Sequence, residues 1–119
     1  MRYTISEMAS LLGVTTHTLR YYEKMGLIRP EVNEETGYRY YTVTDTRRFN
    51  LCRELRAAEL SLEECRELIG SPSVEQSDKM FARQAARLRR RQVLDELSIH
   101  FLEKMQEQYR TLEQDVGRV

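Results

Sequence analysis

The chain has no tryptophan and only two prolines, two cysteines and five glycines among its 119 residues. So little proline and glycine excludes collagen-like and low-complexity chains. No apolar run approaches the ~18 residues that a membrane-spanning helix needs, and the N-terminus lacks the apolar segment of a signal peptide. With 40% hydrophobic and 32% charged residues, the composition predicts a helix-rich cytoplasmic protein without membrane contact.

The cysteines are too few and too isolated to suggest a metal site. Cys52 and Cys65 lack the CxxC spacing, and the two histidines, His17 and His100, are remote from them and from each other. We therefore expect both thiols to be buried as small hydrophobic groups, without a disulfide or zinc. No nucleophile with a base, no carboxylate pair in an apolar setting and no phosphate-binding glycine loop is present, which predicts no enzymatic activity, no metal and no cofactor.

Charge is balanced along the whole chain. Residues 1–70 contain 10 Lys and Arg against 11 Asp and Glu, and residues 71–119 contain 9 against 8. This balance argues mildly against nucleic-acid binding, because such domains are often basic. The acids, however, cluster at residues 31–35 and 59–67, whereas residues 15–20 contain none. A locally basic face is therefore compatible with zero net charge.

The first third of the chain predicts a helix-turn-helix. Ser6 is predicted to cap a helix over residues 7–12, with Met8, Leu11 and Leu12 facing inward and Gly13 as its end. Thr15 is predicted to cap a second helix, Thr16–Lys24, with Leu19 and Tyr22 inward. Two short helices joined by a glycine-containing turn form this motif.

A hairpin and two more helices are predicted next. Residues 27–32 and 38–42 flank a turn-rich segment and indicate a small β-hairpin, or wing. Thr44 is expected to cap a helix to about residue 58 that has Phe49, Leu51, Cys52 and Leu55 available for the core. Ser61 and Glu64 form a capping box for a helix that ends at Gly70.

The last part of the chain predicts one long helix. Ser73 and Gln76 form another capping box, and a helix over residues 74–116 would be about 65 Å long. Its apolar stripe has no core of its own, so the simplest partner is the same helix of a second copy. The residues predicted to dimerise are Leu94, Phe101, Leu102, Met105, Tyr109 and Leu112.

Seven segments of the chain form a recognisable set: Ile5-Ser6-Glu7-Met8-Ala9, Gly13-Val14-Thr15, Thr18-Leu19-Arg20-Tyr21-Tyr22-Glu23, Gly26-Leu27-Ile28-Arg29-Pro30, Gly37-Tyr38-Arg39-Tyr40-Tyr41, Leu55-Arg56 and Leu60-Ser61-Leu62-Glu63-Glu64. In these segments and in the order of its elements, the chain resembles the mercury-resistance regulator (MerR) family of bacterial winged helix-turn-helix transcription regulators. The resemblance covers about residues 1–70, and the long helix agrees with the family's dimerisation coil in position and length. It implies a mainly α fold, with a winged helix-turn-helix domain at residues 1–70 and a linker and long coiled-coil helix at residues 71–119.

The resemblance implies a homodimer that binds a palindromic operator in double-stranded DNA at a promoter. Family members bend and untwist the DNA so that promoter elements realign for RNA polymerase, which is regulation through DNA deformation. The alternative is a protein–protein interaction module that acts through the coiled-coil helix.

The sequence departs from the family pattern in several places. Glu59 stands where the family usually has glycine, and His17 stands where a basic side chain often enters the groove. Residues 70–119 contain no cysteine, which argues against a thiolate metal sensor or an iron–sulfur sensor. They also contain no ligand-binding domain of the type found in drug-responsive members, so we expect either a short member or part of a longer chain.

The predicted DNA-contacting residues lie on the second helix and the wing. Thr16, His17 and Thr18 open the helix, and the N-terminal end of a recognition helix points at base edges. Arg20 and Tyr21 are placed for phosphate, and Tyr22 is shared between DNA and the core.

In the wing, Arg39 is the strongest phosphate or minor-groove candidate, with Tyr38 and Tyr41 beside it. Strand alternation places Arg39 and Tyr41 on one face and Tyr38 and Tyr40 on the other, so that one tyrosine pair packs inside. Glu23 is predicted to pair with an arginine of the protein, because phosphate repels a carboxylate.

Overall fold

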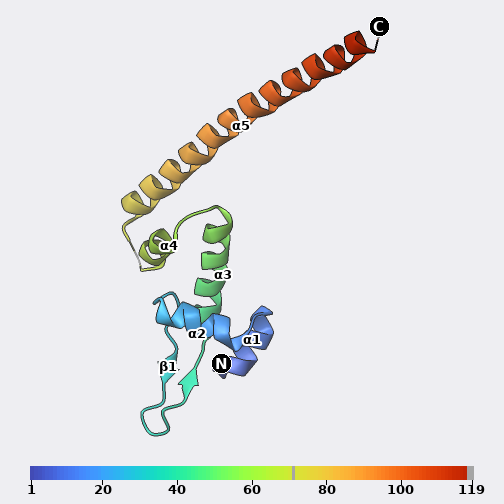
Figure 1. Ribbon diagram of the computed structural model, residues 1–119. Helices are drawn as coiled ribbons and strands as arrows, with labels where there is room; N and C mark the ends of the chain where they lie inside the picture. The colour runs from blue at the N-terminus through green and yellow to red at the C-terminus, as the bar shows by residue number, and fades with distance from the viewer. Residues whose placement is uncertain (71, 118–119) are drawn as a thin grey trace. The chain divides into compact units, whose positions relative to one another are not determined.

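The computed structural model describes residues 1–70 and 72–117, and these fall into two compact units with a boundary between Ser77 and Asp78. The element order is α1 (Ile5–Leu12), α2 (Thr16–Lys24), β1 (Glu31–Val32), β2 (Arg39–Tyr40), α3 (Val43–Ala57), α4 (Leu62–Ile69) and α5 (Val74–Val116). Figure 1 shows the helix pair α1 and α2 followed by the β1–β2 hairpin, as a winged helix-turn-helix requires. The predicted fold class is confirmed.

Helix α1 begins earlier than predicted because Thr4, not Ser6, caps it. The Thr4 hydroxyl accepts from the Glu7 backbone N–H at 3.2 Å, and Glu7 Oε1 accepts from the Thr4 N–H at 3.2 Å. Such a reciprocal box needs a carboxylate or amide three residues after the cap, and Ser6 has only Ala9 in that position. At α2 the predicted cap is confirmed, since Thr15 accepts from the Thr18 N–H at 3.1 Å.

The same rule corrects the start of α3. Its N-cap is Thr42, whose box partner is Asp45, whereas the predicted Thr44 is followed three residues later by Arg47. The capping box between Ser61 and Glu64 at α4 is confirmed.

The two strands of the wing are shorter than predicted. Glu31 pairs with Tyr40 and Val32 with Arg39 in an antiparallel register. The segment after β2 pairs elsewhere, because Tyr41 exchanges two backbone hydrogen bonds of 2.7 and 2.8 Å with Tyr3. Tyr41 thus pairs with the N-terminal segment, and not with the other strand of the hairpin as expected.

Two buried clusters hold the winged domain together. The first joins α1, α2, the wing and α3; the second joins the α2–β1 connection to α3 and α4. Tyr22 packs against both clusters. The predicted inward positions Leu11 and Leu51 are wrong, since both side chains are exposed. The buried members of the clusters are Met8, Ala9, Leu19, Leu27, Ile28, Tyr41, Phe49, Cys52, Leu55, Leu60 and Cys65.

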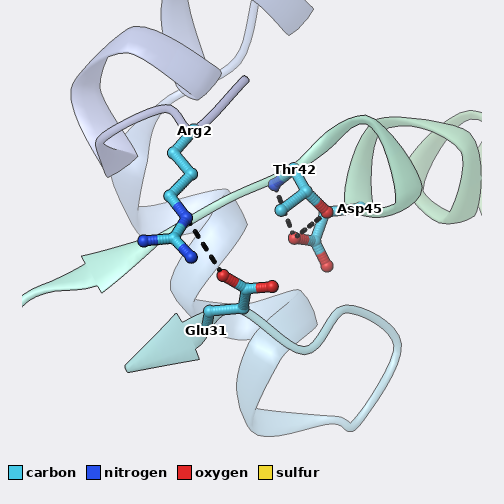
Figure 2. Close-up of polar contacts among 4 residues, drawn as sticks. All are labelled: Arg2, Glu31, Thr42 and Asp45. Carbon is cyan, nitrogen blue, oxygen red and sulfur yellow. Dashed lines mark hydrogen bonds and ion pairs between the residues drawn. The ribbon is translucent and has the colours of Figure 1, made fainter. Parts of the chain in front are cut away.

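Asp45 is a buried acid that ties α3 to the wing. One carboxylate oxygen accepts from the Arg29 backbone N–H at 3.1 Å and the other from the Thr42 N–H at 2.9 Å. Figure 2 shows the contact with Thr42 beside an ion pair between Arg2 and Glu31, whose Nε and Oε2 lie 3.3 Å apart. Asp45 therefore fixes the chain just before β1 and just after β2.

The cysteines are buried as predicted, and both thiols are free. Cys52 of α3 and Cys65 of α4 lie close enough for a side-chain hydrogen bond. Burial first, and then the neighbouring Cys65, raises the pKa of Cys52 to about 11. Burial likewise raises the pKa of Cys65.

The turn between α3 and α4 uses a non-glycine residue in a left-handed conformation. Glu59 has a φ of 65°, a region that L-residues other than glycine, asparagine and aspartate visit rarely. The chain therefore keeps the bend at the position where the resemblance suggested a glycine, with a carboxylate side chain in its place.

Helix α5 covers 43 residues, or about 65 Å at 1.5 Å per residue. Ser73 and Gln76 make the predicted capping box at its start, with bonds of 3.1 and 3.3 Å. Within the described residues, no helix combines the length and the apolarity that crossing a bilayer requires.

Replacing Asp45 by alanine is expected to destabilise the domain. It would leave two backbone N–H groups without their acceptor, and each buried unsatisfied donor costs about 1–3 kcal/mol. Denaturant unfolding followed by circular dichroism measures the change. Glu34→Ala, which removes an exposed acid of the wing turn, is the matched control and should change the free energy of unfolding by less than about 0.5 kcal/mol. Equal stability of both variants would contradict this role of Asp45.

Both thiols should resist modification in the folded protein. Their raised pKa values keep them protonated at pH 8, and only a thiolate reacts with a disulfide reagent. Because the unfolded chain ionises first as pH rises, this contribution to stability is intact below about pH 9 and is lost as pH approaches 11. Colorimetric thiol titration should find no rapid reaction in buffer and two thiols in guanidinium; rapid reaction of the folded chain would contradict the burial.

Candidate nucleic-acid interface

The N-terminal half of α2 presents a polar, acid-free surface. His17, Arg20 and Tyr21 are exposed, and Thr16 and Thr18 are half-buried. The Thr15 and Thr18 hydroxyls lie 2.9 Å apart, so Thr18 takes part in the cap that starts the helix. Burial of Leu19 fixes how the helix is rotated against the domain, because the side chains at neighbouring positions must then point outward.

Tyr22 is mainly a packing residue. Its ring meets that of Phe49 edge-on, with centroids 4.8 Å apart, and it is half-buried between the two clusters. Desolvation raises its pKa above the ordinary value of 10.0, helped by the neighbouring Cys52. The raised pKa keeps the hydroxyl protonated at neutral pH.

Of the three predicted contact residues in and next to the wing, two have exposed side chains and one is buried. Tyr38 is 68% exposed and the Arg39 side chain 56% exposed. Tyr41 is fully buried, so the prediction that its side chain contacts DNA is wrong. The physical reason is the backbone pairing with Tyr3, which carries this residue into the first cluster.

Glu23 joins α2 to the wing. Its Oε1 lies 2.7 Å from Arg39 Nη1, and its Oε2 accepts from the Tyr41 hydroxyl at 3.1 Å. Arg39 and Tyr41 thus share one face of the wing, as alternation predicted, and the predicted arginine partner of Glu23 is confirmed. Burial and the Glu23 charge raise the pKa of Tyr41 to about 12, which keeps this hydroxyl a donor.

A hollow of about 550 Å³ brings α2 and the wing together. Among the predicted contact residues it gathers Arg20, Tyr38, Arg39 and Tyr41, whereas the Thr16–Thr18 end of the helix and Tyr21 and Tyr22 lie outside it. Two guanidinium groups in one concavity attract an anion, and arginine forks match phosphate oxygens. The lining consists of Thr4, Ile5, Arg20, Gly37, Tyr38, Arg39, Tyr40 and Tyr41.

The sequence-based prediction did not include the contribution of α1 to this hollow. Thr4 and Ile5 lie at the start of that helix and reach the wing through the pairing of Tyr3 with Tyr41. The signal was the Thr4–Glu7 capping box, which would have placed the helix start two residues earlier. Across residues 1–70 and 72–117, no three His, Cys, Asp or Glu side chains are grouped closely enough to hold a metal ion.

Comparison with known proteins agrees with this geometry. A family model described as "MerR HTH family regulatory protein" matches residues 3–71. The regulator ZntR of Escherichia coli is 43% identical over 67 residues, which cover 56% of this chain and 48% of ZntR. The transcriptional regulator YyaN of Bacillus subtilis is 33% identical over 118 residues, covering 97% of this chain and 83% of YyaN. The chain spans about half the length of the ZntR and CueR relatives it matches.

Solved structures extend the similarity beyond the winged domain. HiNmlR, a MerR family regulator lacking the sensor domain and bound to promoter DNA, is 26% identical with a TM-score of 0.62, over 87% of this chain and 92% of that one. A MerR family regulator from Bacillus cereus is also 26% identical, with a TM-score of 0.68 over 92% of this chain and 84% of that one.

Proposed function

Since this chain belongs to the MerR family of helix-turn-helix regulators, we propose that it is a transcriptional regulator that binds promoter DNA as a homodimer. The observation that carries the proposal is the shared hollow of Arg20 and Arg39, beside the exposed N-terminal end of α2. HiNmlR, a relative of similar length, was solved on promoter DNA. The relatives are regulators of transcription, and we propose no catalytic activity.

In this proposal, the start of α2 contacts bases, whereas the rest of α2 and the wing contact the DNA backbone. Thr16, His17 and Thr18 lie where a recognition helix reads base edges in the major groove. Arg20, Tyr21, Tyr38 and Arg39 hold the sugar–phosphate backbone on either side, which sets orientation without reading sequence. Tyr22 acts through packing, because its half-buried ring supports the helix from inside.

Dimerisation is proposed to come from α5. Leu94, Phe101, Leu102, Tyr109 and Leu112 are each more than half exposed, and Met105 is half-buried within the same stripe. Apolar side chains repeated along 43 residues form a surface that soluble monomers rarely leave open. A second α5 would cover it and would hold two winged domains for half-sites about 34 Å apart.

Regulation would then act through the shape of the DNA. A dimer fixed at both ends of an operator can bend or untwist the base pairs between its half-sites, and the added contacts offset the cost of deformation. Residues 1–70 would form the DNA-binding domain, and residues 71–119 would form the linker and the dimerisation helix. RNA polymerase would bind the promoter once its elements are realigned. We place the protein in the cytoplasm, where promoter DNA is found in bacteria.

Arg20→Ala is expected to weaken binding to a duplex selected by the protein from random sequence. Loss of one charge-assisted hydrogen bond of about 1.5–3 kcal/mol predicts at least a tenfold rise in Kd. The slope of log affinity against log salt should fall by about one. Fluorescence anisotropy measures both, and Lys24→Ala, an exposed charge at the other end of α2, is the matched control. Unchanged affinity for Arg20→Ala would remove it from the interface.

Arg39 needs a second variant because its loss also exposes the Glu23 charge. Arg39→Ala should weaken binding by tenfold or more, and Arg39→Ala combined with Glu23→Gln should remain weak if the guanidinium contacts phosphate. Recovery of wild-type affinity in the double variant would instead mean that Arg39 only neutralises Glu23. The measurement is the same anisotropy titration.

Replacing Leu102, Met105 and Tyr109 together by alanine should convert the dimer to a monomer. Alanine preserves the helix while removing the apolar stripe. Light scattering after size exclusion measures the mass, and DNA affinity should fall because one half-site is held. The matched control is Glu103→Ala, Glu107→Ala and Arg110→Ala, which changes another face of the same turns. A dimer that survives the first triple change would place the contact elsewhere.

A further inference from the structure

A second concave site lies at the opposite end of α2 from its base-reading residues. A pocket of about 190 Å³ lies within the winged unit, at the connection between α2 and β1, where α3 and α4 also meet. The two concavities share no lining residue, so this pocket is distinct from the hollow of Arg20 and Arg39. Its lining consists of Gly26, Arg29, Arg48, Arg66, Ile69 and Gly70.

Three arginines line this pocket, and no acid lines it. Asp45 is close in the chain to Arg48, yet its two oxygens are occupied by the backbone N–H groups of Arg29 and Thr42. Glu63 lies 3.7 Å from Arg66 but points from outside the lining. Like charges held around one small concavity repel one another, so an anion between them would relieve that repulsion.

The pocket is also partly preorganised. Arg66 Nε donates to the Met25 carbonyl oxygen at 2.8 Å, which fixes its guanidinium at the end of α2. Arg48 is half-buried on α3, and the Arg29 backbone is held by Asp45. Side chains already fixed by the fold lose less freedom when they bind a ligand.

We propose that Arg29, Arg48 and Arg66 form a binding site for a phosphate-type oxoanion. The planar guanidinium offers paired N–H donors that match two oxygens of a phosphate, and three such groups from three elements can surround one. The anion is either free in solution or a backbone phosphate of DNA, since both present the same oxygens. The site is additional to the DNA contacts proposed above.

Titration of the whole protein with inorganic phosphate tests the site without DNA. At pH 7.5 and constant ionic strength set by chloride, the arginine Nε–H signals of the three residues should shift and saturate, with a Kd of about 1 mM or lower. Arg48→Gln should weaken binding at least tenfold, and Arg47→Gln, an exposed arginine one position earlier, should leave Kd unchanged. Arg29→Gln, exposed, serves as a second test should Arg48→Gln fail to fold.

The same titration in the presence of the selected DNA duplex distinguishes a free anion from a DNA backbone phosphate as the ligand. If DNA phosphate occupies the site, bound duplex should abolish the phosphate shifts, and Arg29→Gln should lower the salt slope by about one. If the anion is free, phosphate should bind equally well to the DNA complex, and the slope should stay unchanged. Shifts that never saturate, or that are the same in Arg48→Gln and Arg47→Gln, would overturn the proposal. None of these outcomes depends on whether Arg20 and Arg39 contact the operator.

Discussion

The Glu23 carboxylate is the contact on which the geometry of the DNA-facing surface depends. It binds Arg39 through one oxygen and Tyr41 through the other, so a single side chain of α2 fixes an exposed and a buried side chain on the same face of the wing. The carboxylate is mostly shielded, at 18% exposure, which strengthens both contacts relative to water. Position and charge are therefore coupled: the group that orients Arg39 also cancels part of its charge.

This coupling explains how a chain with zero net charge can present a surface for DNA. Three acids of the winged domain are engaged within the protein: Glu23 with Arg39, Glu31 with Arg2, and Asp45 with backbone N–H groups. Each therefore positions an element instead of repelling phosphate. Arg20 has no such partner near it in the hollow, because no acid lines that hollow. The local field there is set by Arg20 and by Arg39, part of whose charge Glu23 cancels, and the total over 119 residues has little bearing on it.

The sequence predicted the order of the elements, the recognition helix and the long helix, because each carries a strong local signal. Where the prediction was wrong, the observed structure depends on a long-range contact or on a reciprocal pair of hydrogen bonds. Helices α1 and α3 begin after the threonine that has a carboxylate three residues later, Glu7 or Asp45, and not after the hydroxyl residue that was predicted as the cap. Tyr41 was assigned to DNA because alternation identifies a face but not whether that face is buried. Backbone pairing with Tyr3, 38 residues away, draws Tyr41 into the first cluster. The sequence singled out Arg20 and Arg39 separately, and only the folded structure shows that they line one concavity.

The two halves of the chain are stabilised in different ways, and this difference bears on function. The winged unit has two buried clusters, so it can hold its contact residues rigidly by itself. Beyond residue 84, by contrast, helix α5 has no buried residue in its described part, and an isolated helix of this kind is stabilised mainly by packing against a partner. In the proposed dimer, folding of α5 and pairing of two chains would be one event. A regulator built this way would gain its second half-site only when its helix is paired, so that DNA affinity would depend on protein concentration.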